Sequence, residues 1–484
     1  GIEELRPGHT RVYDERGMRD TPHAAPSYPE RGRHSDCAWR NVEEAAQAVR
    51  AALENAVRLR VQRADVPVGS YLSGGLDSSL VAALGRRHTR GTFRTFSLRF
   101  EDAEYDETHY QRLMARTLAS EHHELTVRRR DVAESLPEVV AHAERPILRA
   151  GPAPLFLLSR LVHRAGIKVV LTGEGADEVF AGYDLFREAK VRRFWARFPE
   201  SRLRPRALER LYPYLERSPV SKRALAREVF GRDLDRAQDP GFGHAVRWRT
   251  TGALKRLFND ALRERVGGRD VIEEFLGTLP AGFTRWNGLA QDQHIEIRTL
   301  LSGYLLSAQG DRMLMAHSVE GRYPYLDGAL GRIGDALPAH YKLRALDEKH
   351  VLKRVARDLV PMEIRARHKQ PYRAPDALAL VANDRPAYID ELLSRASIAA
   401  AGIFDPDAVQ RLWQKCRRAG DTAQFSNADN MALVGVVSAQ LVHHHFIRER
   451  PTVRTVARLN TDIDCTSTPS TDSRHHARRR TVAT

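Results

Sequence analysis

The stretch YLSGGLDSS, Tyr71 to Ser79, puts two glycines and three serines between two apolar runs. Upstream, residues 65–72 are rich in valine and predict a short buried strand, and downstream the apolar residues of 78–88 recur at helical spacing, with serines suited to cap the helix. Glycine and serine clusters are usually only turns. A strand, a glycine turn and a capped helix together favour an anion site, because free N–H groups then point at a ligand above Gly74 and Gly75.

The loop matches neither of the two common phosphate-binding patterns, G-x-x-x-x-G-K-[ST] and G-x-G-x-x-G. Its sequence, Ser73 to Ser78, resembles the pyrophosphate loop of the N-type ATP pyrophosphatases. That superfamily includes asparagine synthetase, β-lactam synthetase, GMP synthetase, NAD synthetase and tRNA-modifying enzymes, which cleave ATP between the α- and β-phosphates. The resemblance implies ATP as the nucleotide and Asp77 as a ligand of Mg²⁺, whose preferred ligands are oxygens.

Composition narrows the class of protein. A chain of 484 residues with 42% hydrophobic content is long enough for two or more domains, and no apolar run approaches the length of a membrane span. Cys37, Cys416 and Cys465 lie far apart, which predicts neither a zinc site nor a disulfide framework and fits a reducing, cytoplasmic location. The net charge of +15 is spread along the whole chain, so we do not expect a nucleic-acid partner.

Strand-like runs alternate with helical stretches in the first part of the chain. The runs are residues 66–72, 92–100, 124–127 and 167–171. This alternation predicts an α/β fold with a doubly wound parallel sheet that binds ligands at the carboxyl ends of its strands. The resemblance makes it a sheet of the pyrophosphate-loop type, similar to the adenine nucleotide α-hydrolases, with a helical C-terminal portion.

The same patterns divide the chain. Residues 1–40 are expected to end a preceding domain and form a linker, and residues 41–450 to form the synthetase domain. Within it, 41–190 carry the nucleotide-binding sheet, opened by an amphipathic helix over about 41–63, and 191–450 are mainly helical. Residues 451–484 are polar, basic and low in apolar content, which predicts a disordered tail.

A second loop repeats the plan of the first. IKVVLTGEGADEVFAGY, Ile167 to Tyr183, is a β-branched strand, a glycine loop and a helix, and the loop carries Glu174, Asp177 and Glu178. The three carboxylates could simply form an acidic first turn, where the helix dipole favours them. Because neighbouring carboxylates repel one another unless cations or proton transfers use them, the group with its flanking glycines favours a functional site.

The second loop is similar to the asparagine synthetase signature [LV]-[ST]-G-E-G-[AS]-D-E-x-F-x-G-Y. The resemblance implies that Asp77 and Asp177 hold Mg²⁺, that Glu174 is the general base and that Glu178 contacts substrate. β-Lactam synthetases carry a tyrosine at the position of Glu174, so the glutamate favours an ammonia-using enzyme. The residues implied for ATP binding, partly through backbone groups, are Leu72, Ser73, Gly74, Gly75, Asp77, Ser78, Leu98, Thr172 and Gly173.

Two later segments extend the resemblance. DRMLMAHSVEGRYPYLDG, residues 311–328, is similar to the family segment E-x-R-x-P-[FY]-L-D, and EKHVLKRVA, residues 348–356, is similar to E-K-x-x-L. By itself Lys349 would be read as a solvated helix lysine. The resemblance makes Lys349 catalytic and Glu348 substrate-binding, and the chemistry agrees, because the loop has no lysine of its own to neutralise a transferring phosphoryl group.

The N-terminal stretch GIEELRPGHTRVYDERGM resembles the closing strands of a class-II glutaminase domain. Such a domain begins with a nucleophilic cysteine, and Cys37 does not lie in a comparable setting. The resemblance therefore implies a glutaminase domain outside this sequence as the partner that supplies ammonia.

The function implied is that of an asparagine synthetase, which adenylates the side chain of aspartate with ATP and transfers ammonia to it. Leu306 and Gln309 stand where the family carries an aspartate and an arginine of the aspartate pocket, and KQPYRAPD, residues 369–376, replaces the family segment K-E-x-F-S-D-G. An amidotransferase of a natural-product pathway acting on another acid therefore stays open. A tRNA-modifying enzyme shares only the first loop, and the intact acidic residues disfavour a non-catalytic scaffold. A homodimer is left open.

Overall fold

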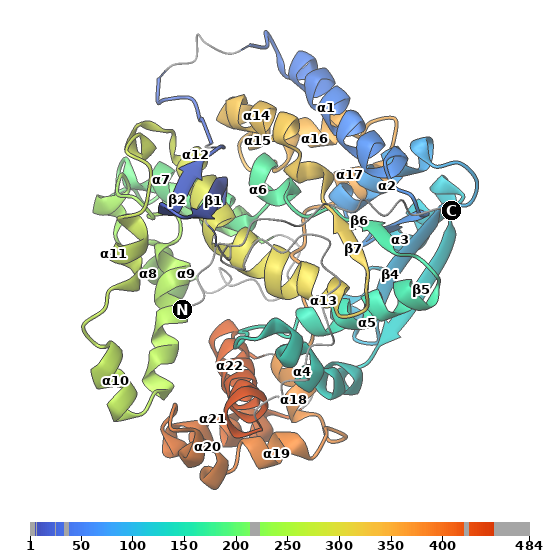
Figure 1. The fold of residues 1–484 in the computed structure, drawn as a ribbon. Helices are drawn as coiled ribbons and strands as arrows, with labels where there is room; N and C mark the ends of the chain where they lie inside the picture. Colours follow the sequence, from blue (N-terminus) through green and yellow to red (C-terminus); the bar gives the residue numbers. More distant parts are fainter. Residues whose placement is uncertain are drawn as a thin grey trace, which may run out of the picture.

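A five-stranded parallel sheet forms the centre of the computed structural model, which describes residues 5, 7–24, 26–32, 38–212, 223–420 and 425–449 (Figure 1). The strands are β3 (Val68–Tyr71), β4 (Arg94–Phe100), β5 (Glu121–Val127), β6 (Val169–Leu171) and β7 (Glu320–Arg322), in the spatial order β5-β4-β3-β6-β7. The chain enters at β3, builds one side of the sheet and then crosses to β6 on the other side. This reversal creates a switch point between β3 and β6, where open α/β sheets bind ligands.

Helices cover both faces of the sheet, as its hydrophobic strands require. On one face lie α1 (Val42–Gln62), α2 (Leu76–His88) and α3 (Thr108–Leu118), and on the other lie α4 (Arg129–Ala143) and α5 (Pro152–Arg164). Strand β6 shows the alternation: Val169 and Leu171 pack with the first group of helices, and Val170 packs with the second. The predicted doubly wound α/β fold is confirmed.

The rest of the described chain is mainly helical. The middle portion contains α6 (Ala176–Phe180), α7 (Asp184–Ala196), α8 (Arg223–Phe230), α9 (Ala245–Gly252), α10 (Asp260–Val266), α11 (Val271–Leu276) and α12 (Gly288–Glu296). A π-helix (Ile297–Asp311) follows, and then α13 (Arg312–Met315), α14 (Gly328–Ala336), α15 (Ala339–Lys342), α16 (His350–Val355) and α17 (Met362–Ala366). The last helices are α18 (Asp376–Val381), α19 (Tyr388–Leu392), α20 (Arg395–Ala401), α21 (Pro406–Ala419) and α22 (Asn427–His443).

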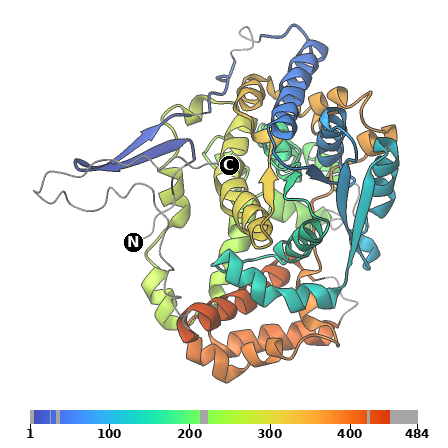
Figure 2. The same cartoon turned by 45° about the vertical axis from the view of Figure 1, so that its right-hand side comes forward.

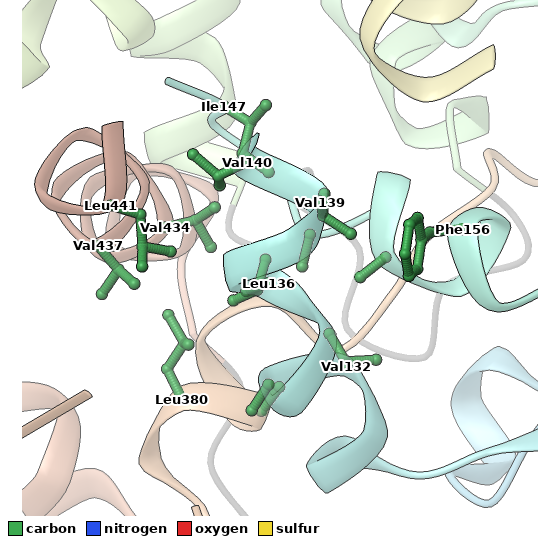
Figure 3. Packing of buried hydrophobic residues seen from close by; sticks show 14 of the residues in the cluster. Val132, Leu136, Val139, Val140, Ile147, Phe156, Leu380, Val434, Val437 and Leu441 are labelled. Atoms are coloured by element: carbon green, nitrogen blue, oxygen red, sulfur yellow. The ribbon is translucent and has the colours of Figure 1, made fainter. Parts of the chain in front are cut away.

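Helix α4 joins the C-terminal helices to the sheet. Leu136 and Val140 of α4 belong to one buried cluster with Val434 and Leu441 of α22, and Figure 3 shows these side chains facing one another together with Leu380 of α18. The C-terminal helices therefore share a core with one face of the sheet. Among the described residues, no helix has both the length and the apolar content needed to cross a membrane.

The N-terminal stretch forms an antiparallel hairpin, β1 (His9–Asp14) and β2 (Gly17–Pro22), which extends away from the sheet (Figure 2). Val12, Tyr13 and Met18 on this hairpin are 43%, 72% and 51% exposed. The chain after the hairpin is anchored by Tyr28, whose buried ring lies 4.9 Å from that of Trp286.

The structure adds one strand to the predicted elements and confirms one predicted helix. Strand β7 was not predicted, because its three residues, Glu-Gly-Arg, carry no apolar alternation. The amphipathic helix over about 41–63 is confirmed as α1, with the Asn41 side chain accepting the cap hydrogen bond from the backbone of Glu44. The predicted disordered tail, 451–484, and two of the three cysteines, Cys37 and Cys465, lie outside the described residues.

Candidate active site

Two glycine loops meet at the switch point of the sheet, one after β3 and one after β6. Gly74 has φ +80°, and a Cβ atom there would lie 2.9 Å from the Cβ atom of Tyr110. A Cβ atom at Gly173 would lie 3.1 Å from the backbone nitrogen of Ser78. Glycine is therefore required in both loops, in the first for backbone conformation and in both for close approach.

The predicted serine cap on α2 is wrong. The helix begins at Leu76, its N-cap is Gly75, and no side chain caps it. The serines instead connect the two ends of the loop. Ser78 Oγ accepts a hydrogen bond from the Ser73 backbone nitrogen at 3.1 Å and lies 2.9 Å from Ser73 Oγ. The first N–H groups of α2 are thus left without a side-chain cap.

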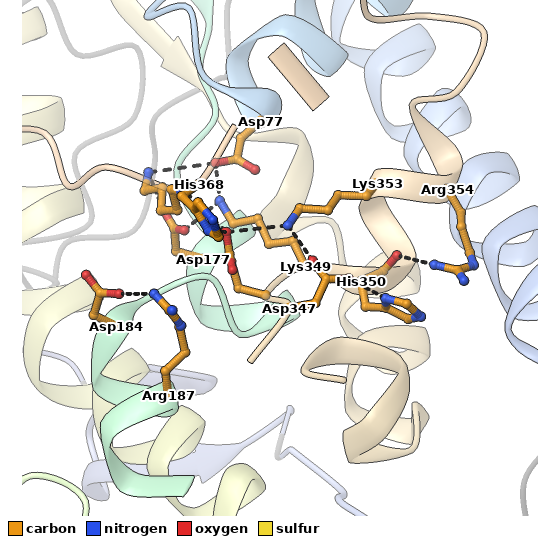
Figure 4. A network of polar contacts seen from close by, with 12 residues as sticks. Asp77, Asp177, Asp184, Arg187, Asp347, Lys349, His350, Lys353, Arg354 and His368 are labelled. Atoms are coloured by element: carbon orange, nitrogen blue, oxygen red, sulfur yellow. Dashed lines mark hydrogen bonds and ion pairs between the residues drawn. The ribbon is translucent and has the colours of Figure 1, made fainter. Parts of the chain in front are cut away.

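Two aspartates and two lysines form a cluster between these loops (Figure 4). Asp77 lies in the first turn of α2, and Asp177 lies in the first turn of α6. The ammonium group of Lys349 contacts Asp77 and lies 2.5 Å from Asp177 Oδ1. The ammonium group of Lys369 lies 2.8 Å from Asp177 Oδ2 and 3.9 Å from Asp77 Oδ2. The sequence thus anticipated both aspartates and one lysine, and the structure brings these three together.

Lys349 is held in an unusual way. It is 2% exposed, and its backbone at the start of α16 has φ +52°, a left-handed conformation that costs a non-glycine residue energy. Gly182 gives it room, because a Cβ atom at this position would lie 2.1 Å from Lys349 Cε and 2.0 Å from Asp177 Oδ1. The fold therefore directs this lysine to the aspartates at the expense of backbone strain.

Lys369 is the functional candidate that the sequence did not reveal. It lies on the segment after α17 and, at 27% side-chain exposure, is nearer to solvent than Lys349. Burial favours its neutral form, but the carboxylates of Asp177 and Asp77 outweigh burial and raise the pKa of Lys369. The signal was the lysine of K-E-x-F-S-D-G, which this chain keeps at position 369 although the residues after it differ.

The cluster makes its two aspartates unequal. Burial works against ionisation of Asp177, but Lys349 and Lys369 outweigh it and hold the pKa of Asp177 below its ordinary value. At Asp77, burial and repulsion by Asp177 prevail over the attraction of Lys349, and its pKa is raised. Asp177 is therefore the more firmly ionised partner of the lysines.

The two glutamates of the second loop lie beside this cluster in different settings. Burial raises the pKa of Glu174, whose Oε2 has no hydrogen-bond partner among the described residues. Glu178 is 1% exposed, and burial followed by repulsion from Asp177 raises its pKa to about 8. The Tyr183 hydroxyl donates to Glu178 Oε1 at 2.7 Å. Glu178 is thus held by Tyr183 through one oxygen, and each glutamate keeps its Oε2 without a partner among the described residues.

Glu348 does not join the aspartates. It is 1% exposed, and its Oε1 accepts a hydrogen bond from the Lys369 backbone at 3.1 Å and lies 3.4 Å from the ammonium group of Lys353. Its contacts within the protein position the backbone of Lys369. A role in binding substrate, expected from the sequence, stays a prediction.

Several backbone groups that the sequence predicts near the nucleotide already make hydrogen bonds within the protein. The Leu98 carbonyl accepts a hydrogen bond from Gln111 Nε2 at 2.9 Å, and the Leu72 backbone nitrogen donates to the Phe96 carbonyl at 2.9 Å. The Thr172 backbone nitrogen donates to the carbonyl of Arg322 at 3.0 Å. The bonds of Leu72 and Thr172 continue the sheet by one residue beyond the ends of β3 and β6, and the bond from Gln111 ties α3 to β4.

The segment 311–328 connects the β7 edge of the sheet to helix α1. Arg322 in β7 donates to the carbonyl of Arg60 at 2.5 Å, and Arg60 pairs with Asp327 at 3.0 Å. Both contacts tie the edge of the sheet to α1. Leu306 and Gln309, the two departures from the family pattern, lie on the π-helix.

Buried polar atoms without a partner gather around the two loops. Within the described residues, the atoms at this end of the sheet that lack a hydrogen bond include Tyr71 OH, Asp77 Oδ1, Gln111 Oε1, Glu174 Oε2, Glu178 Oε2 and Tyr304 OH. An unsatisfied buried polar group costs about 1–3 kcal/mol. Such a concentration is typical of a site that binds polar ligands.

Known proteins with related sequences carry two kinds of name. A putative glutamine-hydrolysing asparagine synthetase of Mycobacterium tuberculosis is 31% identical over 327 residues, which are 68% of this chain and 48% of that protein. Asparagine synthetase 1 of Bacillus subtilis is 26% identical over 333 residues, 69% of this chain and 50% of that protein. Amidase chyE of Penicillium rubens is 29% identical over 466 residues, 90% of this chain and 66% of that protein.

The chain spans about half the length of these bacterial relatives and about two thirds of the fungal one. The family model described as asparagine synthase matches residues 48–444, a range that contains both glycine loops and both lysines. This chain belongs to the asparagine synthase family.

Proposed function

We propose that this chain is the synthetase part of an ATP-dependent amide-forming ligase of the asparagine synthase type. It activates a carboxylic acid as an acyl-adenylate, releasing pyrophosphate, and transfers ammonia derived from glutamine to the acyl group. For aspartate the products are asparagine, AMP and pyrophosphate. The observation that carries the proposal is the pairing of Asp77 and Asp177 with Lys349 and Lys369 at the switch point of the sheet.

The loop after β3 suits the phosphates of ATP. Its glycines leave the backbone open, and the uncapped N–H groups of α2 point toward this edge of the sheet. The carboxylate of the acid attacks the α-phosphorus, and the bond to the β-phosphate oxygen breaks. Lys349 and Lys369 lie where their ammonium groups can exchange aspartate oxygens for phosphate oxygens, so they stabilise the charge of the departing pyrophosphate.

The two aspartates fit a magnesium ion. Mg²⁺ is usually held by one or two carboxylates together with waters and substrate phosphates, and Asp77 Oδ1 is a buried oxygen with no hydrogen-bond partner among the described residues. Asp77 and Asp177 would hold the ion. When bound, Mg²⁺ neutralises charge on the phosphates.

Glu174 suits the second step. Ammonia attacks the acyl carbon, AMP leaves, and a base must accept a proton from the ammonium group that forms. Burial raises the pKa of Glu174, which brings a carboxylate closer to the neutral range where a general base works best. Its free Oε2 is available for this transfer.

We further propose that residues 41–450 form the synthetase unit and that the hairpin before it belongs to a glutaminase domain. A two-stranded hairpin with exposed Val12, Tyr13 and Met18 fits an element that packs against further structure. Burial raises the pKa of the Cys416 thiol to about 11, so this cysteine is a poor nucleophile. We expect residues 1–484 to form amide from ammonium salts and to release no glutamate from glutamine.

The test measures pyrophosphate release and amide formation separately, with a panel of acids and with ammonia supplied. Asp77→Asn and Lys369→Ala should each lower the rate of pyrophosphate release by at least 100-fold, about 2.7 kcal/mol or more in the barrier. Lys415→Ala is the matched control, because Lys415 pairs with Asp429 on distant helices and should not affect the rate.

Glu174→Gln separates the two steps. It should retain pyrophosphate release and lose amide product, since only the attack of ammonia needs a base. Equal loss of both steps would assign Glu174 to binding instead, and wild-type rates in Asp77→Asn would refute the proposed nucleotide site.

A further inference from the structure

Four tyrosines from four separate segments surround the edge of the site next to Glu174. Tyr71 ends β3, Tyr304 lies on the π-helix, Tyr323 follows β7 and Tyr372 lies on the segment that carries Lys369. We call these four residues the tyrosine cluster. Burial, and after it the charge of Glu174, raise the pKa of Tyr71 and Tyr323. Tyr304 and Tyr372 meet at Gly151, where a Cβ atom would lie 3.4 Å from the Tyr304 hydroxyl and 3.5 Å from Tyr372 Cε1. The cluster therefore extends from Glu174 to the π-helix.

Two of the four hydroxyl groups have partners and two do not. The Tyr323 hydroxyl donates to Asp311 at 2.6 Å, and the Tyr372 hydroxyl donates to the Gly151 carbonyl at 3.2 Å. The hydroxyl groups of Tyr71 and Tyr304 are buried and have no hydrogen-bond partner among the described residues. Because a buried hydroxyl group without a partner is unfavourable, these two hydroxyls are suited to bind a ligand.

The π-helix presents Tyr304 and Gln309 to this space. It runs for 15 residues, whereas most π-helical segments are single turns, and such segments are frequent at functional sites. A Cβ atom at Gly151 would lie 2.9 Å from Gln309 Oε1 and 3.4 Å from the Tyr304 hydroxyl. Both side chains thus approach the backbone of residue 151, where only glycine leaves room.

At the end of the cluster away from Glu174, two charged groups are already paired with each other. Arg149 and Asp376 both act electrostatically on Tyr304, and they bind each other at 3.1 Å. Asp376 also accepts a hydrogen bond from the Ala150 backbone at 2.6 Å. A second charged group of a ligand at this end could find a partner only by breaking this pair, and otherwise its charge would be left unpaired.

The cluster also reaches the surface. Tyr372 is 40% exposed, and the same segment carries Lys369 to the aspartates. The exposed edge of the cluster therefore lies on the segment that leads to Lys369.

Resting on the proposed ligase function, we propose that the tyrosine cluster binds the acid that is activated, and that this acid is uncharged apart from its reacting carboxylate. Its body is apolar and carries a hydrogen-bonding oxygen or nitrogen that reaches Tyr304 or Tyr71. The carboxylate lies at the Glu174 end, where it attacks the α-phosphorus and later loses AMP to ammonia. Free aspartate, with its additional carboxylate and ammonium group, is a poor substrate.

The experiment measures acid-dependent ATP–pyrophosphate exchange by the chain of residues 1–484. The probes are L-aspartate, benzoate, 2-hydroxybenzoate, 2-aminobenzoate and an N-acetylated neutral amino acid. We expect kcat/KM for at least one of the neutral-bodied acids with a polar group to exceed that for L-aspartate by 100-fold or more. Benzoate, which lacks the polar group, should be at least tenfold worse than that acid.

Tyr304→Phe and Tyr71→Phe test the residues. Each removes one oxygen and should lower kcat/KM for the preferred acid by about tenfold or more, while KM for ATP stays within twofold. The preference over benzoate should shrink in parallel. Tyr388→Phe is the control, because the Tyr388 hydroxyl donates to the Ala133 carbonyl at 2.6 Å on the C-terminal helices, away from the cluster.

The outcomes separate this inference from the proposed function. Exchange driven best by L-aspartate would overturn the inference and leave the ligase function standing. An equal effect of Tyr304→Phe on every acid would also overturn it. If no acid supports exchange while ATP binding is measurable by calorimetry, the ligase function itself fails, and the inference fails with it.

Discussion

Gly182→Ala tests how strictly the fold positions Lys349. The change adds a single methyl group, whose carbon would lie 2.1 Å from Lys349 Cε and 2.0 Å from Asp177 Oδ1. Non-bonded carbon atoms are most stable at about 3.5–4.0 Å, so the lysine chain must move by well over 1 Å. We expect the ammonium group to leave its position between the two aspartates.

The magnitude follows from what the displacement removes. Overpacking a buried site costs about 1–3 kcal/mol, and breaking a buried ion pair adds further destabilisation. Removing one preorganised charge from a phosphoryl-transfer site typically costs about 3–4 kcal/mol in the barrier, or 100- to 1000-fold in rate. Gly182→Ala should therefore resemble Lys349→Ala in pyrophosphate release, although it leaves every catalytic side chain in the sequence.

Pyrophosphate release and chemical denaturation are the two assays. Gly331→Ala is the control, because a Cβ atom at Gly331 meets nothing within 4 Å and the residue lies within helix α14. This control should keep full activity and gain up to about 1 kcal/mol in stability from the better helix propensity of alanine.

A double mutant distinguishes displacement from general damage. In Gly182→Ala/Lys349→Ala the clash with the lysine is gone and the close contact with Asp177 Oδ1 remains, so the activity of the double mutant should lie between that of Lys349→Ala and the product of the two losses. If Gly182→Ala retains activity within threefold of the wild type, or if the losses multiply, the positioning described for Lys349 is incorrect.

Two buried ionic groups predict how stability depends on pH. Burial lowers the pKa of Lys342 to about 8, below its ordinary value of about 10.5. The free energy of unfolding should therefore fall by about 3 kcal/mol as pH decreases from about 10.5 to 8, because the unfolded chain takes up the proton first. In chemical denaturation, the free energy of unfolding of Lys342→Met should not change in this way over the same pH range. At Glu296, burial opposes ionisation but Arg247 and His244 outweigh it and lower the pKa to about 2. Glu296 should therefore contribute about 3 kcal/mol to the free energy of unfolding above about pH 4.5, and this contribution should be lost as pH falls to 2. If Glu296→Gln loses as much stability between pH 4.5 and 2 as the wild type does, this prediction is wrong.

The parts of the site that the sequence revealed are local. Each glycine loop lies within one strand-loop-helix unit, so the residue types, the glycines and the acidic side chains all fall within a short window. Asp77 and Asp177 could be expected near each other because the ends of parallel strands share one edge of the sheet. The structure places both in contact with Lys349, a pairing that the sequence analysis did not predict.

The parts that stayed hidden depend on contacts between distant segments. Lys369 is defined by its 2.8 Å contact with Asp177, and the one sequence signal for it, the lysine that it shares with the family segment, is obscured because the residues after it differ. Strand β7 exists because β6 supplies its hydrogen bonds. The π-helix has no sequence signal of its own, so the close approach of Tyr304 to Gly151 could not be predicted either.

The four charges at the switch point explain why the site has two lysines. Two ammonium groups and two carboxylates sum to zero, and a balanced, hydrogen-bonded set is the form in which buried charges are tolerated. Arrival of a polyphosphate chain adds negative charge to this set, and the lysines can turn toward it only if a cation replaces them at the carboxylates. If the proposed function holds, we expect the nucleotide to bind more tightly together with its metal than alone, because the metal would offset part of the negative charge that the phosphates bring to the buried set.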